Sequence, residues 1–363
     1  MFTLKPDYDA VLNRFEAWWH AEIVDRPLFG LRLPQPPEKR LAVPVKHFGS
    51  HRERWLDTGY MVERTVTAMA NQMYLADSLP ITFPNLGPEV FSACYGCELD
   101  YGENTTWSKP ILKDLSAESL ASIAFDLNSF AFRKLDEMTR ALLEVGQGHF
   151  IVGYTDVHPG GDAIAAFRDP QELLMDTIDN PAGIKKLVAQ VTDDFIRFYD
   201  HFYDLLSGAG MPSTSWLPAI GKGRYHIPSN DFSCMISDSM FEELFIPGII
   251  RECRHMDHCI YHLDGPQALR YLDRLLDIPE IQAIQWVPGA GHGGWRGSIP
   301  VYQRIQNKGK SFYVEPVPAQ DLDELFTQLA PEGVWISAVT GVATIAEADA
   351  VTAKIAGWTR RKG

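Results

Sequence analysis

The feature that most constrains the fold is a regular alternation of two kinds of segment along the chain. Apolar runs of about five to seven residues alternate with stretches whose apolar residues recur at helical spacing. Each run followed by such a stretch is typical of a parallel strand with a crossover helix, so the pattern predicts an α/β fold of the (β/α)8 TIM-barrel type. The eight expected strands cover residues 27–33, 79–83, 149–155, 213–217, 258–263, 281–287, 311–314 and 334–338.

The barrel is expected to use the whole chain, residues 1–363, as one domain. Residues 1–26 form a helical extension, and residues 84–116, after the second strand, form an insertion that lines the barrel mouth. A doubly wound sheet is the rival architecture, and it would more often show a glycine-rich phosphate loop after an early strand. The glycine-rich residues 289–294 come late and lack that spacing, so the barrel is favoured.

Charge, cysteine content and apolar run length limit the partners and the cellular compartment that we expect for this chain. The formal net charge of −14 disfavours nucleic acid and anionic membranes as partners. Five cysteines, an odd number in a long chain, are typical of reduced thiols in the cytoplasm, and the single CxxC pair of Cys94 and Cys97 is a weak zinc signal. No signal peptide is visible, and no segment approaches about 18 uninterrupted apolar residues, so we expect no membrane span.

The strongest candidate for chemistry is His262-Leu263-Asp264-Gly265, at the end of the fifth expected strand. Residues two apart on a strand point to the same face, so His262 and Asp264 would project together at the carboxyl end of the strand. Chemistry in α/β barrels is placed at that end. The pair could be catalytic, bind a metal ion or only fix a loop.

Other polar and aromatic residues are expected at the same end of the barrel. Asp156 and His158 would form an acid–base pair or a capped turn before two glycines. Glu315 ends another strand as a candidate acid or metal ligand, and Arg32 would hold a substrate carboxylate or pair with an acid in the mouth. The remaining candidates would contact a small-molecule substrate, or pack in the case of the tryptophans: Trp216, Trp286, His292 in its glycine-rich loop, and Tyr225 and His226 in a basic loop that could close over an anion.

Several of these segments together resemble the uroporphyrinogen decarboxylase superfamily. They are Val152-Gly-Tyr-Thr-Asp156, Phe167-Arg-Asp-Pro170, Leu173-Leu-Met, Asn180-Pro181, Ile236-Ser237 with Phe241 and Pro247, and Tyr261-His-Leu-Asp-Gly265. The chain looks most like the members related to corrinoid-dependent methyltransferases. The resemblance implies a (β/α)8 barrel and an enzyme that moves a methyl group between a small substrate and a corrinoid carried by a partner protein.

The methyltransferases of this superfamily bind zinc through a His-x-Cys-Gly motif at the fifth strand and a cysteine near the eighth. Here His262 matches the histidine, Asp264 stands in the cysteine position, and residues 336–341 contain no cysteine. The resemblance therefore implies either a harder site for zinc or another divalent ion, made by His262 and Asp264 with Glu315 or His292, or a metal-free acid–base pair. The arginine-rich motif of the decarboxylase itself is absent, so a porphyrinogen substrate is not expected.

Three functions remain open from the sequence. The first is a metal-assisted methyltransferase or demethylase component. The second is a decarboxylase or lyase of a small carboxylic acid, with His262 and Asp264 handling the proton. The third is a non-catalytic barrel that binds a ligand or a corrinoid protein. Barrels of this kind commonly pair, so a homodimer is expected.

Overall fold

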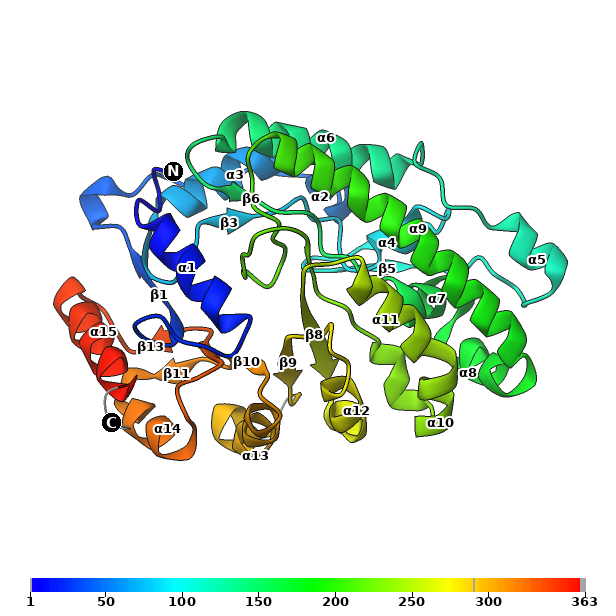
Figure 1. The fold of residues 1–363 in the computed structure, drawn as a ribbon. Helices are drawn as coiled ribbons and strands as arrows, with labels where there is room; N and C mark the ends of the chain where they lie inside the picture. Colours follow the sequence, from blue (N-terminus) through cyan, green and yellow to red (C-terminus); the bar gives the residue numbers. More distant parts are fainter. Residues whose placement is uncertain (1, 290, 360–363) are drawn as a thin grey trace.

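The computed structural model describes residues 2–289 and 291–359, and its centre is a largely parallel sheet surrounded by helices (Figure 1). The strand order is β2-β1-β12-β10-β9-β8-β7, with every neighbouring pair parallel except β1 and β2. These strands are β1 (Leu28–Pro34), β2 (Gln72–Ala76), β7 (Tyr225–His226), β8 (His258–Asp264), β9 (Ala283–Val287), β10 (Ser311–Val314) and β12 (Val334–Ile336). The predicted α/β class is confirmed at this level.

The remaining strands form three small pairs. They are β3 (Ile81–Thr82) with β6 (Ile151–Val152), β4 (Leu99–Tyr101) with β5 (Thr106–Ser108), and β11 (Val317–Pro318) with β13 (Val339–Thr340). The expected strand at 213–217 has no regular ladder, because side chains there bond to backbone groups, as Thr214 Oγ1 does to the carbonyl of Ala219 at 2.7 Å. The closed eight-stranded ring stays a prediction.

Helices lie along both outer sides of the sheet, with α6 and α9 on one side and α12, α13 and α14 on the other (Figure 1). The longest, α9, starts with Pro181 at its first turn and an Asn180 side chain that accepts a hydrogen bond from the Gly183 amide. The α-helices are α1 (Tyr8–Trp18), α2 (His51–Leu56), α3 (Thr58–Ala70), α4 (Val90–Ala93), α5 (Ala117–Ser122), α6 (Phe130–Gly146), α7 (Gly160–Arg168), α8 (Pro170–Asp179), α9 (Pro181–Gly208), α10 (Asp238–Met240), α11 (Ile246–Arg254), α12 (Leu272–Leu276), α13 (Gly294–Asn307), α14 (Leu322–Gln328) and α15 (Ile345–Thr359). The 3-10 helices are η1 (Pro37–Lys39), η2 (Asp231–Met235), η4 (Pro266–Tyr271) and η5 (Ala319–Asp321), and η3 (Phe241–Phe245) is a π-helix that leads into α11.

The end of α1 closes the sheet where its strands begin. Trp18 Nε1 donates to the carbonyl of Gly333, immediately before β12, at 2.9 Å, and Ser311 Oγ at the start of β10 donates to the Trp18 carbonyl. Trp19 stacks on His258, the first residue of β8, with ring centroids 4.6 Å apart. The indoles of both tryptophans are buried, so the amino-terminal extension is part of the core.

A buried carboxylate ties this extension to the sheet. The side chain of Asp77 is fully buried and forms ion pairs with Arg26 and with Arg14, the latter at 3.2 Å. It also accepts a hydrogen bond from the Phe29 amide of β1 at 3.0 Å. A buried charge is tolerated only when it is paired and hydrogen-bonded, and Asp77 meets both conditions.

The insertion at residues 84–116 packs onto the same core through α4 and carries the β4–β5 hairpin. Cys94 and Cys97 are buried free thiols, and burial raises the pKa of each to about 12, which keeps them protonated at neutral pH. Neither belongs to a cluster of potential metal ligands among the described residues.

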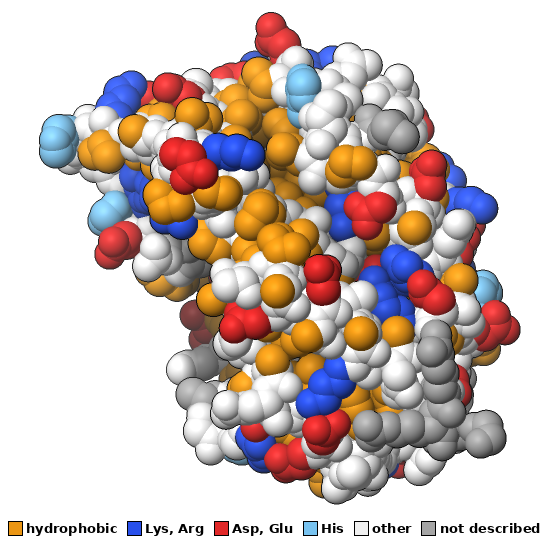
Figure 2. Space-filling view, turned by 90° about the vertical axis from the view of Figure 1, so that its left-hand side faces the viewer, with side chains coloured by type: hydrophobic (Ala, Val, Ile, Leu, Met, Phe, Trp, Pro, Cys, Tyr) orange, Lys and Arg blue, Asp and Glu red, His pale blue; other side chains and the backbone are white. Residues whose placement is uncertain are grey.

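The face that carries α1, β1 and α15 shows hydrophobic side chains gathered in its upper and central part, with charged side chains scattered among and around them (Figure 2). Among the described residues, no helix is both long and apolar enough to cross a bilayer.

Candidate active site

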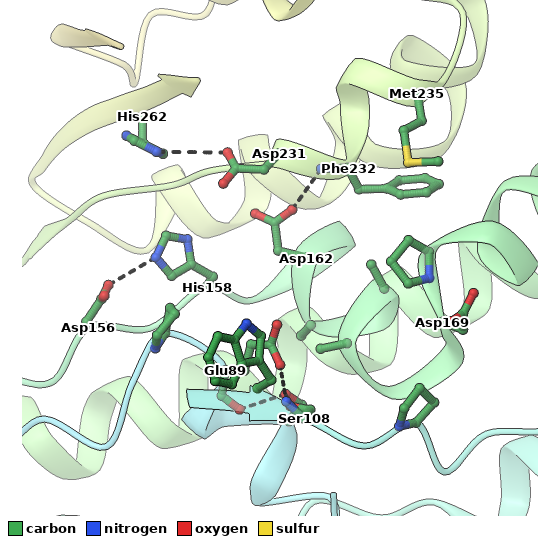
Figure 3. A pocket seen from close by; sticks show the side chains of 18 of the residues that line it. Glu89, Ser108, Asp156, His158, Asp162, Asp169, Asp231, Phe232, Met235 and His262 are labelled. Atoms are coloured by element: carbon green, nitrogen blue, oxygen red, sulfur yellow. Dashed lines mark hydrogen bonds and ion pairs between the residues drawn. The ribbon is translucent and has the colours of Figure 1, made fainter. Parts of the chain in front are cut away.

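A cavity of about 690 Å³ opens at the carboxyl end of β8, and its volume is typical of a small-molecule site. Its wall comes from the insertion, from the loop and helix after β6, from η2 and from β8 (Figure 3). Four of the candidates from the sequence line it: Asp156, His158, Trp216 and His262.

Helix α7 forms one side of the cavity, and the sequence analysis did not predict it. Its first turn is glycine, with Gly160 at φ +63°, and a Cβ atom on Gly161 would lie 2.6 Å from the Asn230 side chain. This close approach places Asp162 against η2, where its carboxylate accepts from Ser229 Oγ at 2.7 Å and from the Phe232 amide at 3.0 Å.

His158 is held at both ring nitrogens. Its Nε2 lies 3.0 Å from Asp156 Oδ1 and its Nδ1 lies 2.8 Å from Ser229 Oγ. Burial opposes protonation, but the carboxylates of Asp156, Asp162 and Asp231 outweigh it and raise the pKa of His158 to about 9. At neutral pH the two residues therefore form an ion pair between an imidazolium and a carboxylate, and their expected role in acid–base chemistry stays a prediction.

His262 has the opposite character. Its Nδ1 lies 2.6 Å from Gln285 Oε1 on β9, and because an amide oxygen only accepts, Nδ1 carries the proton. Burial, together with the neighbouring charge of His158, lowers the pKa of His262. The neutral ring thus points its Nε2 lone pair into the cavity, with the indole of Trp216 packed edge-on at 5.3 Å between centroids.

Asp231 and Asp264 complete a cluster around that lone pair. One ligand atom from each of Asp231, His262 and Asp264 lies within 4.8 Å of the others. Asp231 Oδ1 is 3.9 Å from His262 Nε2 and, although buried, has no hydrogen-bond partner (Figure 3). One imidazole nitrogen and two carboxylate oxygens suit zinc or a harder divalent ion, and the unpartnered oxygen is an observation that fits a metal ligand.

Glu315 and Trp286 lie outside this cluster. Glu315 accepts a hydrogen bond from Ser298 Oγ of α13 at 3.3 Å, and Asp231 occupies the third position that the sequence analysis gave to Glu315 or His292. Trp286 is buried in the core and does not line the cavity, because its side chain alternates with that of Gln285 along β9. His292 lies exposed in its glycine-rich loop and also does not line the cavity.

Tyr225 and His226 were expected in a loop that closes over a ligand, and the structure places them differently. Both are fully buried in β7, and Tyr225 NH is held by the hydroxyl of Tyr199 at 3.0 Å. Arg32 lies on β1 and lines a second cavity, so it does not share the space of His262.

A buried acid lies behind the α7 wall. Glu252 of α11 is 1% exposed, and its Oε2 is 3.9 Å from Nε2 of the equally buried His226. Burial, reinforced by the charge of Asp162, raises the pKa of Glu252 to about 8, and burial lowers the pKa of His226 to about 3. At neutral pH both groups are therefore mainly uncharged.

Sequence reasoning missed Asp231, Asp162, Ser229 and Gln285. A glutamine within the apolar run 281–287 was a visible signal, since a buried amide needs a partner. Asp231 has no comparable signal in the sequence, because it comes close to His262 only once the fold has brought η2 next to β8.

Comparison with known proteins gives a fold but no family. No protein-family model matches the chain, and no curated protein sequence matches it. Among solved structures, a methyltransferase from Methanosarcina mazei matches with a TM-score of 0.56 and 12% sequence identity, over 97% of this chain and 98% of that one. The chain therefore has the overall α/β fold of that methyltransferase along nearly its whole length.

Proposed function

We propose that the chain is an enzyme of the uroporphyrinogen decarboxylase-like type that moves a methyl group between a small substrate and a corrinoid protein. The observation that carries the proposal is the neutral Nε2 of His262 facing Asp231 and Asp264 inside a small-molecule cavity. The full-length fold likeness to a methyltransferase supports the same class of reaction.

Asp231, His262 and Asp264 would hold one divalent ion, with zinc as the first candidate. When bound, such an ion acts as a Lewis acid on the heteroatom of the substrate or acceptor. Gln285 fixes the tautomer that leaves Nε2 of His262 free to ligate.

His158 is a positioning residue in this proposal. Both of its nitrogens are already engaged, so it cannot donate to a substrate without breaking a bond to Asp156 or Ser229. Its positive charge instead balances the carboxylates of Asp162 and Asp231 beside it. The substrate would pack against the apolar part of the wall, formed by Trp216, Phe232 and Met235.

Metal content provides the first test. We expect close to one equivalent of divalent metal in the purified protein, loss of that metal in His262→Ala and Asp231→Asn, and retention in Asp193→Asn, a matched change at an exposed carboxylate. Demethylation of methylcobalamin in the presence of coenzyme M or another small thiol, followed by visible absorbance, tests the reaction. Protein without metal, before and after incubation with zinc, would refute the metal-assisted proposal.

The second candidate function is acid–base chemistry on a small carboxylic acid. The hydrogen-bonded Asp156–His158 pair on the cavity wall favours it. A protein that binds no metal and decarboxylates a small acid, with activity lost in His158→Gln, would support this candidate over methyl transfer.

We also infer that the strands complete the expected ring, with three side-chain hydrogen bonds and one backbone hydrogen bond bridging its gaps. The bridging contacts are Phe29 N to Asp77 Oδ2, Leu31 N to Ser78 Oγ, Tyr154 N to the Thr214 carbonyl and Tyr225 N to Ser213 Oγ, all between 2.8 and 3.1 Å. Ser78→Ala should lower the free energy of unfolding by about 1–3 kcal/mol by orphaning a buried amide. Ser207→Ala, at an exposed serine of α9, is the control, and equal effects of both changes would contradict the inference.

A further inference from the structure

A second cavity, of about 620 Å³, lies beside the first and has walls from β1, β2, α2, α3 and the insertion. No residue lines both cavities. The insertion contributes to both cavities, with Trp107 and Ser108 in the wall of the first and Glu103 and Asn104 in the wall of the second. The proposed function makes no use of this second space.

Three arginines line it, and their neighbours are aromatic rings and neutral oxygens. Arg32 donates to the Leu79 carbonyl at 3.3 Å, and its guanidinium lies over the Tyr74 ring, 5.2 Å from the centroid. Arg54 lies over the Trp55 ring at 5.8 Å. Stacking on aromatic faces restrains both guanidinium planes while leaving N–H groups available to a ligand.

The third arginine, Arg64, donates to the Tyr60 hydroxyl at 3.3 Å. Among the ion pairs of residues 2–289 and 291–359, none involves Arg32, Arg54 or Arg64, although most other arginines of the chain are paired. Unpaired arginines are unexpected in a chain with 47 acidic and 33 basic residues, where carboxylates are abundant.

The charge of this cavity is opposite to that of the chain. Glu103 is the one carboxylate among its lining residues, and its contact with Arg54 runs through the backbone carbonyl. Three arginines and one glutamate leave a formal charge of +2 on a wall that also contains Trp55, Tyr74, Met61 and Met69.

We propose that this cavity is a binding site for a small organic polyanion, one that carries carboxylate or phosphate groups on a compact apolar or planar body. Guanidinium forks bind both kinds of anion through paired, charge-assisted hydrogen bonds. The methionines and aromatic rings would contact the body of the ligand. The site is separate from the cluster at His262 and does not depend on what that cluster does.

Calorimetric titration of the full-length protein with pyrophosphate and with citrate, at matched ionic strength, tests the site and distinguishes the two anion sources. We expect saturable binding of at least one probe, weaker at higher salt. Arg32→Gln and Arg64→Gln should each lower the affinity about tenfold, because each removes a charged hydrogen-bond donor. Arg64→Lys should retain part of the affinity, since lysine keeps the positive charge but cannot form the paired hydrogen bonds of a guanidinium.

Arg52→Gln is the matched control. Arg52 is also an unpaired arginine on α2, but it lies over Phe130 and does not line this cavity. Its removal should leave the affinity nearly unchanged, and circular dichroism of each variant verifies folding. The proposal is overturned if neither probe binds, or if Arg52→Gln weakens binding as much as Arg32→Gln and Arg64→Gln do.

Discussion

Replacing Glu252 by glutamine should make the protein more stable at alkaline pH. Burial keeps this carboxyl protonated in the folded chain up to about pH 8, whereas in the unfolded chain it ionises above its ordinary pKa of 4.5. Between these two values the folded state binds one more proton, so its free energy of unfolding falls as pH rises. The glutamine side chain has the same shape but does not ionise, so the free energy of unfolding of the variant does not fall for this reason.

The magnitude follows from the two pKa values. From pH 4.5 to pH 7.5 the lost stability amounts to about 4 kcal/mol, at about 1.4 kcal/mol for each unit of pH. His226, the nearest titratable neighbour, has a pKa lowered to about 3 and stays neutral throughout this range, so its contribution cancels between the two proteins.

Denaturant unfolding followed by circular dichroism at pH values from 5 to 9 measures this difference. The stability of Glu252→Gln relative to the native protein should rise steadily to about pH 8 and then level off. Glu243→Gln, a change at an exposed glutamate paired with Lys185, should give a difference that hardly varies with pH. A Glu252→Gln curve parallel to that of the native protein would refute the reasoning.

Three further predictions concern the site, the core and the assembly. Gln285→Leu should weaken the metal affinity of the proposed cluster by about 10- to 100-fold, because Nδ1 of His262 loses the acceptor that fixes its tautomer. Competition with a chromogenic chelator measures this affinity, and an unchanged value would contradict the prediction. Asp77→Asn should lower the free energy of unfolding by about 3–5 kcal/mol by leaving Arg26 with an uncompensated buried charge, and a loss below that of a surface Asp→Asn change would refute it. Light scattering should give twice the 40.8 kDa chain mass if the expected homodimer forms, and a single chain mass would reject it.

The parts of the fold that follow from local periodic patterns of apolar residues could be predicted from the sequence. The apolar run at 258–263 is β8, and His262 and Asp264 project together because strand alternation is a local property. The long helix α9 follows in the same way from its apolar period and its proline start.

Features that depend on distant contacts could not be predicted. The segment 213–217 was expected as a strand from its place in the alternating pattern, yet its serine and threonine side chains bond to the backbone in place of a ladder. Helix α7 begins at two glycines, which normally indicate a turn, and Asn230 from a distant segment packs so close to Gly161 that no larger residue fits there. Both effects arise only once segments far apart in the chain have met.

The tryptophan pair at the end of α1 also has a practical consequence for protein engineering. Because Trp18 and Trp19 cover the end of the sheet opposite the cavity, shortened chains that begin at the first predicted strand would expose the starts of β8, β10 and β12 to water. A purification tag should therefore be added in front of the amino-terminal extension and should not replace it.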